Sequence, residues 1–256
     1  MKKISRLNML FILLTIILGL VGCQNSNTEA GSETYTNLTI NIPWIDSEQM
    51  SYRVDNASGK TIGKVVLSIE KEEDVYILGQ NHIADDAQID GFVAVDQKTM
   101  APVVSYKVMS SATAGTTELS CSYDNNRVTV VMPVDAGVED EESQVQGGSM
   151  VIALPDVVFD NDEILFLGRT LPLREGYSTE IASFVVAQLS TPVVLFSVTG
   201  REMVQTPVGE FDCYKVRVGG ISEESIQSTA WLWYSIQGTH PLVKYSSDSG
   251  SFVLIG

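Results

Sequence analysis

The stretch SYRVDNASGKTIGKVVLSIE, residues 51–70, decides the fold class of this chain. Apolar and polar side chains alternate through residues 51–55 and again through residues 60–70, with the two-residue period of a β-strand that buries one face. Residues 56–59 (NASG) between them are turn formers. The stretch therefore predicts a β-hairpin.

The same alternation recurs along most of the remaining sequence. Residues 124–126 (DNN) form another turn signal, because Asn and Asp tolerate left-handed backbone. Short strands this close together, without helical patterns between them, predict an antiparallel all-β architecture. We expect further strands at residues 74–82, 91–95, 103–109, 116–123, 127–131, 181–189, 193–204, 211–218, 230–235, 242–245 and 252–255.

One short helix is expected near residues 160–170. Asp160 can cap its first turn, and the acids at 162 and 163 suit the positive end of the helix dipole. Pro172 limits the helix downstream. The predicted fold is therefore all-β with one short helix.

The N-terminus carries an export signal. Lys2, Lys3 and Arg6 precede an apolar run, residues 7–20, and small residues then lead to Cys23. The sequence LVGC at 20–23 resembles the bacterial lipobox, in which diacylglycerol is attached to the cysteine sulfur and the chain is cut before it. The apolar run is shorter than the roughly 20 residues of a spanning helix, which disfavours the alternative of an uncleaved signal anchor.

The lipobox resemblance divides the chain into three parts. Residues 1–22 are expected to be a lipoprotein signal peptide, and residues 23–34 a polar, flexible tether that begins at lipidated Cys23. Residues 35–256 are expected to form a single β-rich domain. We expect an exported protein held by lipid on the outer face of the cytoplasmic membrane, or a periplasmic or outer-membrane location if the cell has two membranes.

The charge balance excludes one class of partner. The whole chain has 16 basic and 32 acidic residues, and the signal peptide removes three basic ones, so the mature net charge is −19. Such a surface repels phosphate backbones, which argues against nucleic-acid binding. The membrane is then expected to be held by the acyl chains at Cys23. The oligomeric state is not specified by the sequence.

Few residues have the pattern of a catalytic or metal site. His82 and His240 lack a partner in sequence that would mark a nucleophile–base pair. The acidic segment 135–142 (DAGVEDEE) raises the question of calcium, but it lacks the spacing of a calcium loop, and the second acidic segment, residues 160–162 (DND), lacks the glycine. Cys121 and Cys213 fit either a disulfide, which export allows, or two half-buried thiols. We therefore expect no enzyme activity, no metal and no cofactor.

The densest aromatic cluster is WLWY, residues 231–234. On a strand, Trp231 and Trp233 share one face and Tyr234 lies on the other. Core packing suits one of these faces. The alternative is that Trp231, Trp233 and Tyr234 contribute a surface that contacts sugar or lipid.

The C-terminal part of the chain contains a distinctive hairpin sequence, EMVQTPVGEFDCYKV at residues 202–216. It resembles the hairpin E-x-V-x-T-P-A-G-T-F-D-C-Y-K-V of a bacterial exported family, domain of unknown function 3108, with Val208 and Glu210 in place of Ala and Thr. Residues 96–102, 169–176 and 233–245 resemble its segments D-x-x-T-x-x-P, R-x-L-P-L-x-x-G and W-Y-S…P-V-K-Y. The resemblance implies a curved antiparallel sheet or spiral β-roll in the cell envelope. It implies no activity and no catalytic residues.

Our leading functional hypothesis is a non-enzymatic, membrane-anchored envelope lipoprotein whose concave sheet face binds a lipid or a glycan. Carrier and sorting lipoproteins with half-barrel sheets supply the analogy. The first alternative is a structural or assembly lipoprotein that contacts a protein through a sheet edge or through residues 135–142. The second is a glycan hydrolase, which requires two carboxylates about 5–10 Å apart in one cleft.

Overall fold

The computed structural model describes residues 38–44, 46–132, 148–221 and 226–256. The expected signal peptide, Cys23, the tether and the acidic segment 135–142 lie outside these residues. Within the described part of the chain, no helix has the length and apolarity that a membrane crossing requires.

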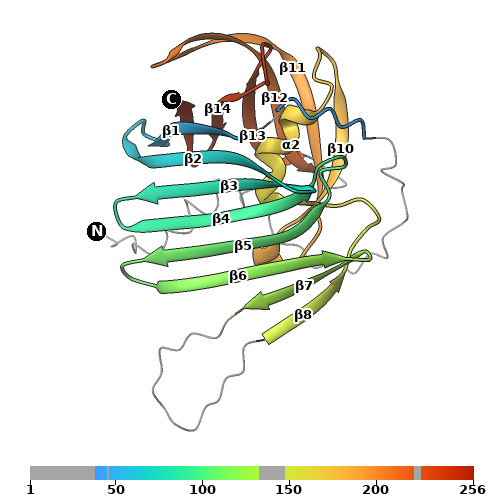
Figure 1. Ribbon diagram of the computed structural model, residues 1–256. Coiled ribbons are helices and arrows are strands. Elements are labelled where there is room, and N and C mark those ends of the chain that lie inside the picture. Colours follow the sequence, from blue (N-terminus) through green and yellow to red (C-terminus); the bar gives the residue numbers. More distant parts are fainter. Residues whose placement is uncertain (1–37, 45, 133–147, 222–225) are drawn as a thin grey trace.

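In the described residues, one curved sheet contains fifteen strands, in the spatial order β8-β7-β6-β5-β4-β3-β2-β1-β15-β14-β13-β12-β11-β10-β9 (Figure 1). Neighbouring strands are antiparallel, except that β9 pairs with β10 in parallel. The strands are β1 Glu48–Asn56, β2 Thr61–Glu72, β3 Val75–Ala84, β4 Ala87–Asp96, β5 Pro102–Ser111, β6 Gly115–Asp124, β7 Arg127–Met132, β8 Gly148–Ala153, β9 Phe159–Asp160, β10 Ser178–Phe184, β11 Val193–Thr206, β12 Gly209–Ile221, β13 Ile226–Ser235, β14 Leu242–Ser247 and β15 Gly250–Leu254.

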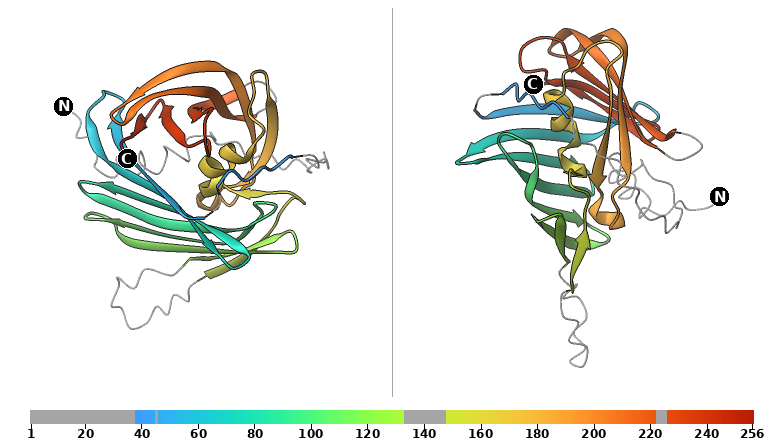
Figure 2. Two further views of the ribbon diagram at one scale, coloured as in Figure 1. Left: turned by 45° about the horizontal axis from the view of Figure 1, so that its top comes forward. Right: turned by 90° about the vertical axis from the view of Figure 1, so that its right-hand side faces the viewer.

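The chain enters this sheet at its centre. β1 pairs with β2 on one side and with the last strand, β15, on the other. One meander therefore runs outward from β1 to β8, and a second returns from β10 to β15. Figure 2 shows the two halves curling towards each other around the helix α2. The expected curved, half-barrel-like antiparallel sheet is confirmed.

Local turn chemistry fixes the hairpins. The Asn56 Oδ1 atom accepts hydrogen bonds from the backbone N–H groups of Ser58 and Lys60, both at 3.0 Å, and closes the β1–β2 turn. Asn125 and Asn126 both adopt positive φ, 48° and 57°, between β6 and β7. Both turns lie where the sequence predicts them.

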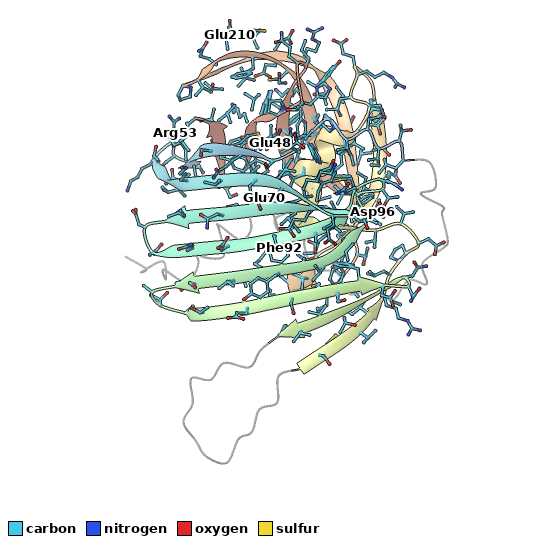
Figure 3. The ribbon with its side chains drawn as sticks, viewed as in Figure 1. Glu48, Arg53, Glu70, Phe92, Asp96 and Glu210 are labelled. Atoms are coloured by element: carbon cyan, nitrogen blue, oxygen red, sulfur yellow. The ribbon has the colours of Figure 1, made fainter. Side chains whose placement is uncertain are left out.

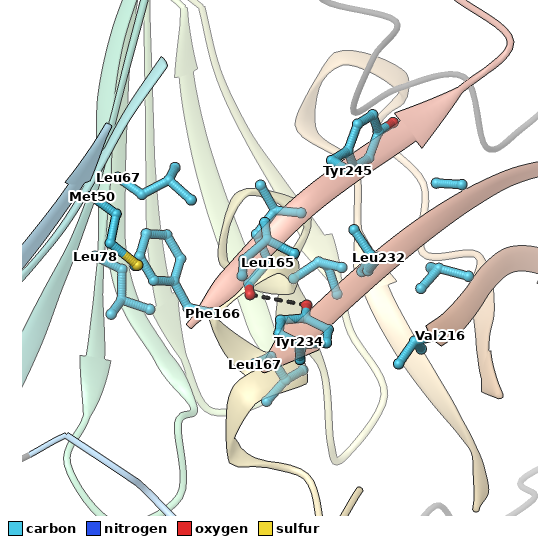
Figure 4. Packing of buried hydrophobic residues seen from close by; sticks show 14 of the residues in the cluster. Met50, Leu67, Leu78, Leu165, Phe166, Leu167, Val216, Leu232, Tyr234 and Tyr245 are labelled. Carbon is cyan, nitrogen blue, oxygen red and sulfur yellow. Dashed lines mark hydrogen bonds between the residues drawn. The ribbon is translucent and has the colours of Figure 1, made fainter. Parts of the chain in front are cut away.

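The expected short helix is also present. A 3₁₀ turn, η1 (Asn161–Glu163), leads into α2 (Ile164–Thr170), and Asp160 and Glu163 form a reciprocal capping box at its start. All seven residues of α2 are buried, because the helix lies inside the curve of the sheet. In Figure 4, Phe166 packs towards Leu67 and Leu78, while Tyr234 donates a hydrogen bond of 3.0 Å to the carbonyl oxygen of Leu165.

Two strand predictions need correction. The strand expected at residues 181–189 ends at Phe184, after which the chain forms a 3₁₀ turn, η2 (Val186–Gln188), and Leu189 adopts a left-handed φ of 51°. Strand β8 was not expected at all. Its side chains are exposed on both faces, so it lacks the alternation that marks a strand with one buried face.

Candidate functional site

A buried acidic cluster lies at the N-terminus of the helix, inside the sheet. It consists of Asp160, Asp162 and Glu163. The Glu163 Oε1 atom accepts a hydrogen bond of 2.7 Å from the backbone N–H of Asp160, and the Asp160 Oδ1 atom accepts one of 2.9 Å from that of Asp162. Asp160 is 2% exposed and Glu163 is fully buried. The helix start therefore holds the three acids together.

Three neighbouring parts of the sheet supply partners to this cluster. Lys107 of β5 forms an ion pair with Asp162. The Tyr123 hydroxyl of β6 donates a hydrogen bond of 2.6 Å to the Asp160 Oδ2 atom. From β3, the Gln80 amide donates to the Asp162 carbonyl oxygen, and its own Oε1 atom lies 3.1 Å from the His82 Nε2 atom.

Burial decides the protonation of these groups. It raises the pKa of Asp160 and raises the pKa of Glu163 well above its ordinary value, and nearby acids add to both effects. Burial lowers the pKa of His82 to about 4, and the charge of Lys107 contributes. Among the described residues, the Glu163 Oε2 atom has no hydrogen-bond partner. The cluster therefore favours neutral Glu163 and neutral His82.

A cleft of about 310 Å³, including its open mouth, adjoins the cluster and is lined by Lys107, Met109, Leu119, Asp160, Asp162 and Val186, among others. Most of that volume is open solvent, and the cleft itself has room for little more than a water molecule, far less than the roughly 300–1,000 Å³ of ligand pockets. A space this small does not admit the sugar that the hydrolase hypothesis requires, although two acids line it. Both are already engaged, Asp160 by Tyr123 and a backbone N–H, and Asp162 by Lys107, so each has a structural role.

The sequence predicts Asp160 as a helix cap but does not predict the cluster around it. Gln80 and His82 occupy inward positions of β3 next to the apolar Tyr76 and Leu78, and this interruption is the available signal. Lys107 has no such signal, because Ser105 shares its face of β5. No group of three or more His, Cys, Asp or Glu side chains in the described ranges has the arrangement of a metal site.

The predicted aromatic ligand surface is divided between the two faces of the sheet. Tyr234 is fully buried against α2, so its assignment to a ligand surface was wrong. Trp231 and Trp233 lie on the opposite, outward face. The Lys215 Nζ atom lies 5.0 Å from the Trp231 ring centroid and 5.3 Å from that of Trp233, and the Lys244 Nζ atom lies 4.6 Å from that of Trp233. Trp233 is 4% exposed, which leaves Trp231 as the more accessible ring.

The concave face is mostly filled. A single core cluster joins α2 to inward side chains of β1–β4 and β10–β15, so this part of the face offers no open surface for a lipid or a glycan. The expectation of a free concave face is wrong there, because α2 packs inside the curve.

The remaining sequence candidates have structural surroundings. Cys121 and Cys213 are buried free thiols in separate clusters, and burial raises their pKa values to about 11 and about 12. His240 adopts a positive φ of 51° in the β13–β14 turn, where its Nδ1 atom lies 2.8 Å from the Ser235 carbonyl oxygen.

The segments that suggested a family all have a structural explanation. The Asp96 Oδ1 atom accepts hydrogen bonds from the backbone N–H and the hydroxyl of Thr99, both at 2.8 Å, at the turn labelled in Figure 3. Thr206 closes the β11–β12 turn through a hydrogen bond of 3.0 Å to the Gly209 carbonyl oxygen. Arg169 is buried and forms an ion pair with Glu48. These residues of the motifs therefore have structural roles.

Solved structures of low sequence identity align over most of the chain. A β-barrel-like protein of domain of unknown function DUF1849 from Brucella abortus aligns with a TM-score of 0.48 at 8% identity, over 82% of this chain and 95% of its own. A proposed exported protein with a YmcC-like fold from Bacteroides fragilis aligns with a TM-score of 0.29 at 12% identity, over 85% of this chain and 98% of its own. A proposed lipoprotein from Parabacteroides distasonis aligns with a TM-score of 0.28 at 15% identity, over 86% of this chain and 98% of its own.

No curated protein matches the sequence significantly. The model of one protein family does match, over residues 49–254, from the first strand of the sheet to the last. The chain therefore belongs to the family described as protein of unknown function DUF3108.

Proposed function

We propose that this protein is a lipid-anchored envelope protein that acts by binding a partner polypeptide at the open edge of its sheet. The lipobox-like sequence at Cys23 supports the anchor. The observation that carries the binding function is the edge strand β8, which has β7 as its single neighbour among the described strands and exposes apolar side chains.

The backbone of β8 is available to a further strand. The Leu154 N–H donates a hydrogen bond of 2.8 Å to the Asn126 carbonyl oxygen, in register with the β7–β8 ladder. Because hydrogen-bonded and non-bonded pairs alternate in an antiparallel ladder, Ser149, Val151 and Ala153 direct their N–H and C=O groups away from β7. An added strand would pair with these groups.

The side chains around this edge favour an apolar partner strand. Val131 and Met132 of β7 and Met150 and Val151 of β8 are 41%, 37%, 45% and 60% exposed, and they make up half of the exposed large apolar residues in the described ranges. An exposed apolar edge of this kind normally attracts another chain unless it is covered.

Charge selects among such partners. Residues 133–147, which join β7 to β8, contain five acidic and no basic residues in sequence. Two copies of this chain paired through β8 would bring two such segments to one interface, which repulsion opposes. We therefore assign the edge to an extended segment of a different envelope protein, with alternating apolar residues and flanking basic ones.

Photo-crosslinking in cells tests this proposal. A photoreactive side chain replaces Ser149 or Val151 in the full chain, and Val103, which is 43% exposed on the interior strand β5, is the matched control. We expect adducts from both β8 positions to a single segment of one partner, at sites about two residues apart. The control position should give none.

A second change separates strand addition from general contact. Ala153→Pro removes an outward N–H without removing a β7 ladder bond, so the adduct from Val151 should fall at least about tenfold while stability to urea changes by less than about 0.5 kcal/mol. Equal adducts from Val103, adducts between two copies of the chain, or insensitivity to Ala153→Pro would contradict the proposal.

A further inference from the structure

Basic side chains form a row across the outward face of the sheet. In the strand registers, Lys215 of β12 is opposite Trp233 of β13, which is opposite Lys244 of β14. The row continues through Val253 of β15 to Arg53 of β1, and each neighbour is again directly opposite. It ends at Lys64 of β2, and Arg217 lies beside its other end, opposite Trp231. We call Arg53, Lys64, Lys215, Arg217 and Lys244 the basic row.

The row faces away from the core. Residues alternate across a strand, and the sequence neighbours of these positions pack inside the sheet. Those neighbours are Val54, Val65, Val216 and Tyr245. Arg53 is labelled in Figure 3. The basic row therefore occupies a surface distinct from both the acidic cluster and the β8 edge.

The charge of the row differs in sign from that of the chain. Asp55 pairs with Arg53 at 3.0 Å and Glu202 pairs with Lys215 at 2.9 Å, so five cations and two carboxylates leave a local charge of +3. The whole chain carries −16. Within the described residues, the buried Nε atom of Arg217 has no hydrogen-bond partner. A positive strip on an acidic protein selects anionic ligands.

We propose that the basic row binds a linear anionic polysaccharide that lies across the strands. Six strands about 4.8 Å apart give a row of roughly 24 Å, long enough for several sugar residues. The partly exposed side chain of Trp231 supplies an apolar contact for a sugar beside Lys215, and the cations supply partners for its acidic groups.

The shape of the sheet favours a polymer over a membrane. The strands that bear the row belong to the wall that curves around α2 (Figure 2), so cations on the outward face diverge from one another. A flexible chain can follow such a surface, whereas a flat bilayer contacts only a part of it. This inference is independent of the β8 proposal, because no residue is shared.

Lysine acylation of the full chain in phosphatidylcholine vesicles tests the inference. A succinimidyl ester labels exposed lysines, and mass spectrometry measures the rate at each position with polygalacturonate or with neutral dextran. We expect polygalacturonate to slow the labelling of Lys64, Lys215 and Lys244 at least about threefold. Two exposed lysines away from the row, Lys71 and Lys98, serve as controls within the same molecule and should keep their rates.

A variant pair keeps the test specific. Arg53→Gln with Arg217→Gln removes two cations of the row but leaves its three reporter lysines, so their protection should be lost. Arg127→Gln with Arg174→Gln makes the same charge change at exposed positions elsewhere and should preserve the protection. Equal labelling with both polysaccharides would overturn the inference. So would protection by phosphatidylglycerol vesicles without protection by polygalacturonate, since the row would then face the membrane.

Discussion

Arg169 is the side chain whose removal should damage this fold most. It is 1% exposed on α2, and its guanidinium forms an ion pair with Glu48 at the start of β1. It also donates to the Thr239 carbonyl oxygen from Nη2 at 2.9 Å and from Nε at 3.2 Å. The ring of Trp44 lies 4.9 Å from the Arg169 Cζ atom. One cation therefore connects the helix, the first strand, the β13–β14 turn and the N-terminal segment.

The expected loss follows from its burial. Removing one member of a buried pair costs about 3–5 kcal/mol, because the partner and the orphaned acceptors remain desolvated. Arg169→Met keeps the apolar volume and removes the charge, so we expect a loss of this size in the free energy of unfolding. Arg201→Met is the matched control. Arg201 pairs with Asp212 on the surface and is 46% exposed, so its loss should cost about 0–1 kcal/mol.

Urea unfolding at pH 7, followed by circular dichroism, gives both values. The slope of the free energy of unfolding against urea concentration should not change between variants, so that the shift of the unfolding midpoint reports stability alone. Combining Arg169→Met with Glu48→Gln should recover part of the loss, because the unpaired charge on Glu48, whose side chain is 24% exposed, is removed as well. A loss below about 1 kcal/mol for Arg169→Met, or one equal to that of the control, would refute this account of the core.

Three further changes test the interior of the sheet by the same unfolding assay. The pKa of His82 is about 4 in the folded protein and 6.5 ordinarily, so between these values the unfolded chain binds a proton that the folded chain does not. The free energy of unfolding should therefore fall by about 3 kcal/mol from pH 7 to below pH 4 because of His82. His82→Gln should remove that part of the pH dependence. The pKa of Glu163 is raised in the folded protein, so the stability that this group contributes is present below the ordinary glutamate pKa and is lost as the pH rises. Glu163→Gln keeps an acceptor for the Asp160 N–H and should therefore be more stable than the wild type at pH 8 but not at pH 3. The reverse order would contradict the assignment. Gly168→Ala places a Cβ atom 2.2 Å from the Tyr234 hydroxyl oxygen and should cost about 1–3 kcal/mol, whereas Gly148→Ala meets no atom within 4 Å and should change stability by less than about 0.5 kcal/mol.

Local signals made the strands and the helix predictable. The alternation of β1 and β2, the asparagine turns and the capping residue Asp160 depend on neighbours a few residues away in sequence. Such short-range preferences are readable without a structure. Most strands on each side of β1 could therefore be predicted from the sequence, but the exposed edge strand β8, the two-residue strand β9 and the end of β10 could not.

Long-range pairing was not readable. Arg169 contacts Glu48 and Thr239, which are 121 and 70 residues away, and Tyr123 reaches Asp160 across 37 residues. A buried arginine and a buried acid have no local pattern that distinguishes them from exposed ones, because only the fold supplies their partners. The same reason explains why Tyr234 was assigned to a surface, since a strand pattern gives two faces without showing which one α2 covers.

The central functional claim is that β8 accepts a partner strand. Crosslinking from Val151 in living cells, with and without Ala153→Pro, tests it most directly. The account predicts one partner segment joined at Val151 and at least about a tenfold loss of that adduct in the proline variant, at unchanged stability. An adduct that persists in the proline variant, or one that forms equally well from Val103, would contradict it.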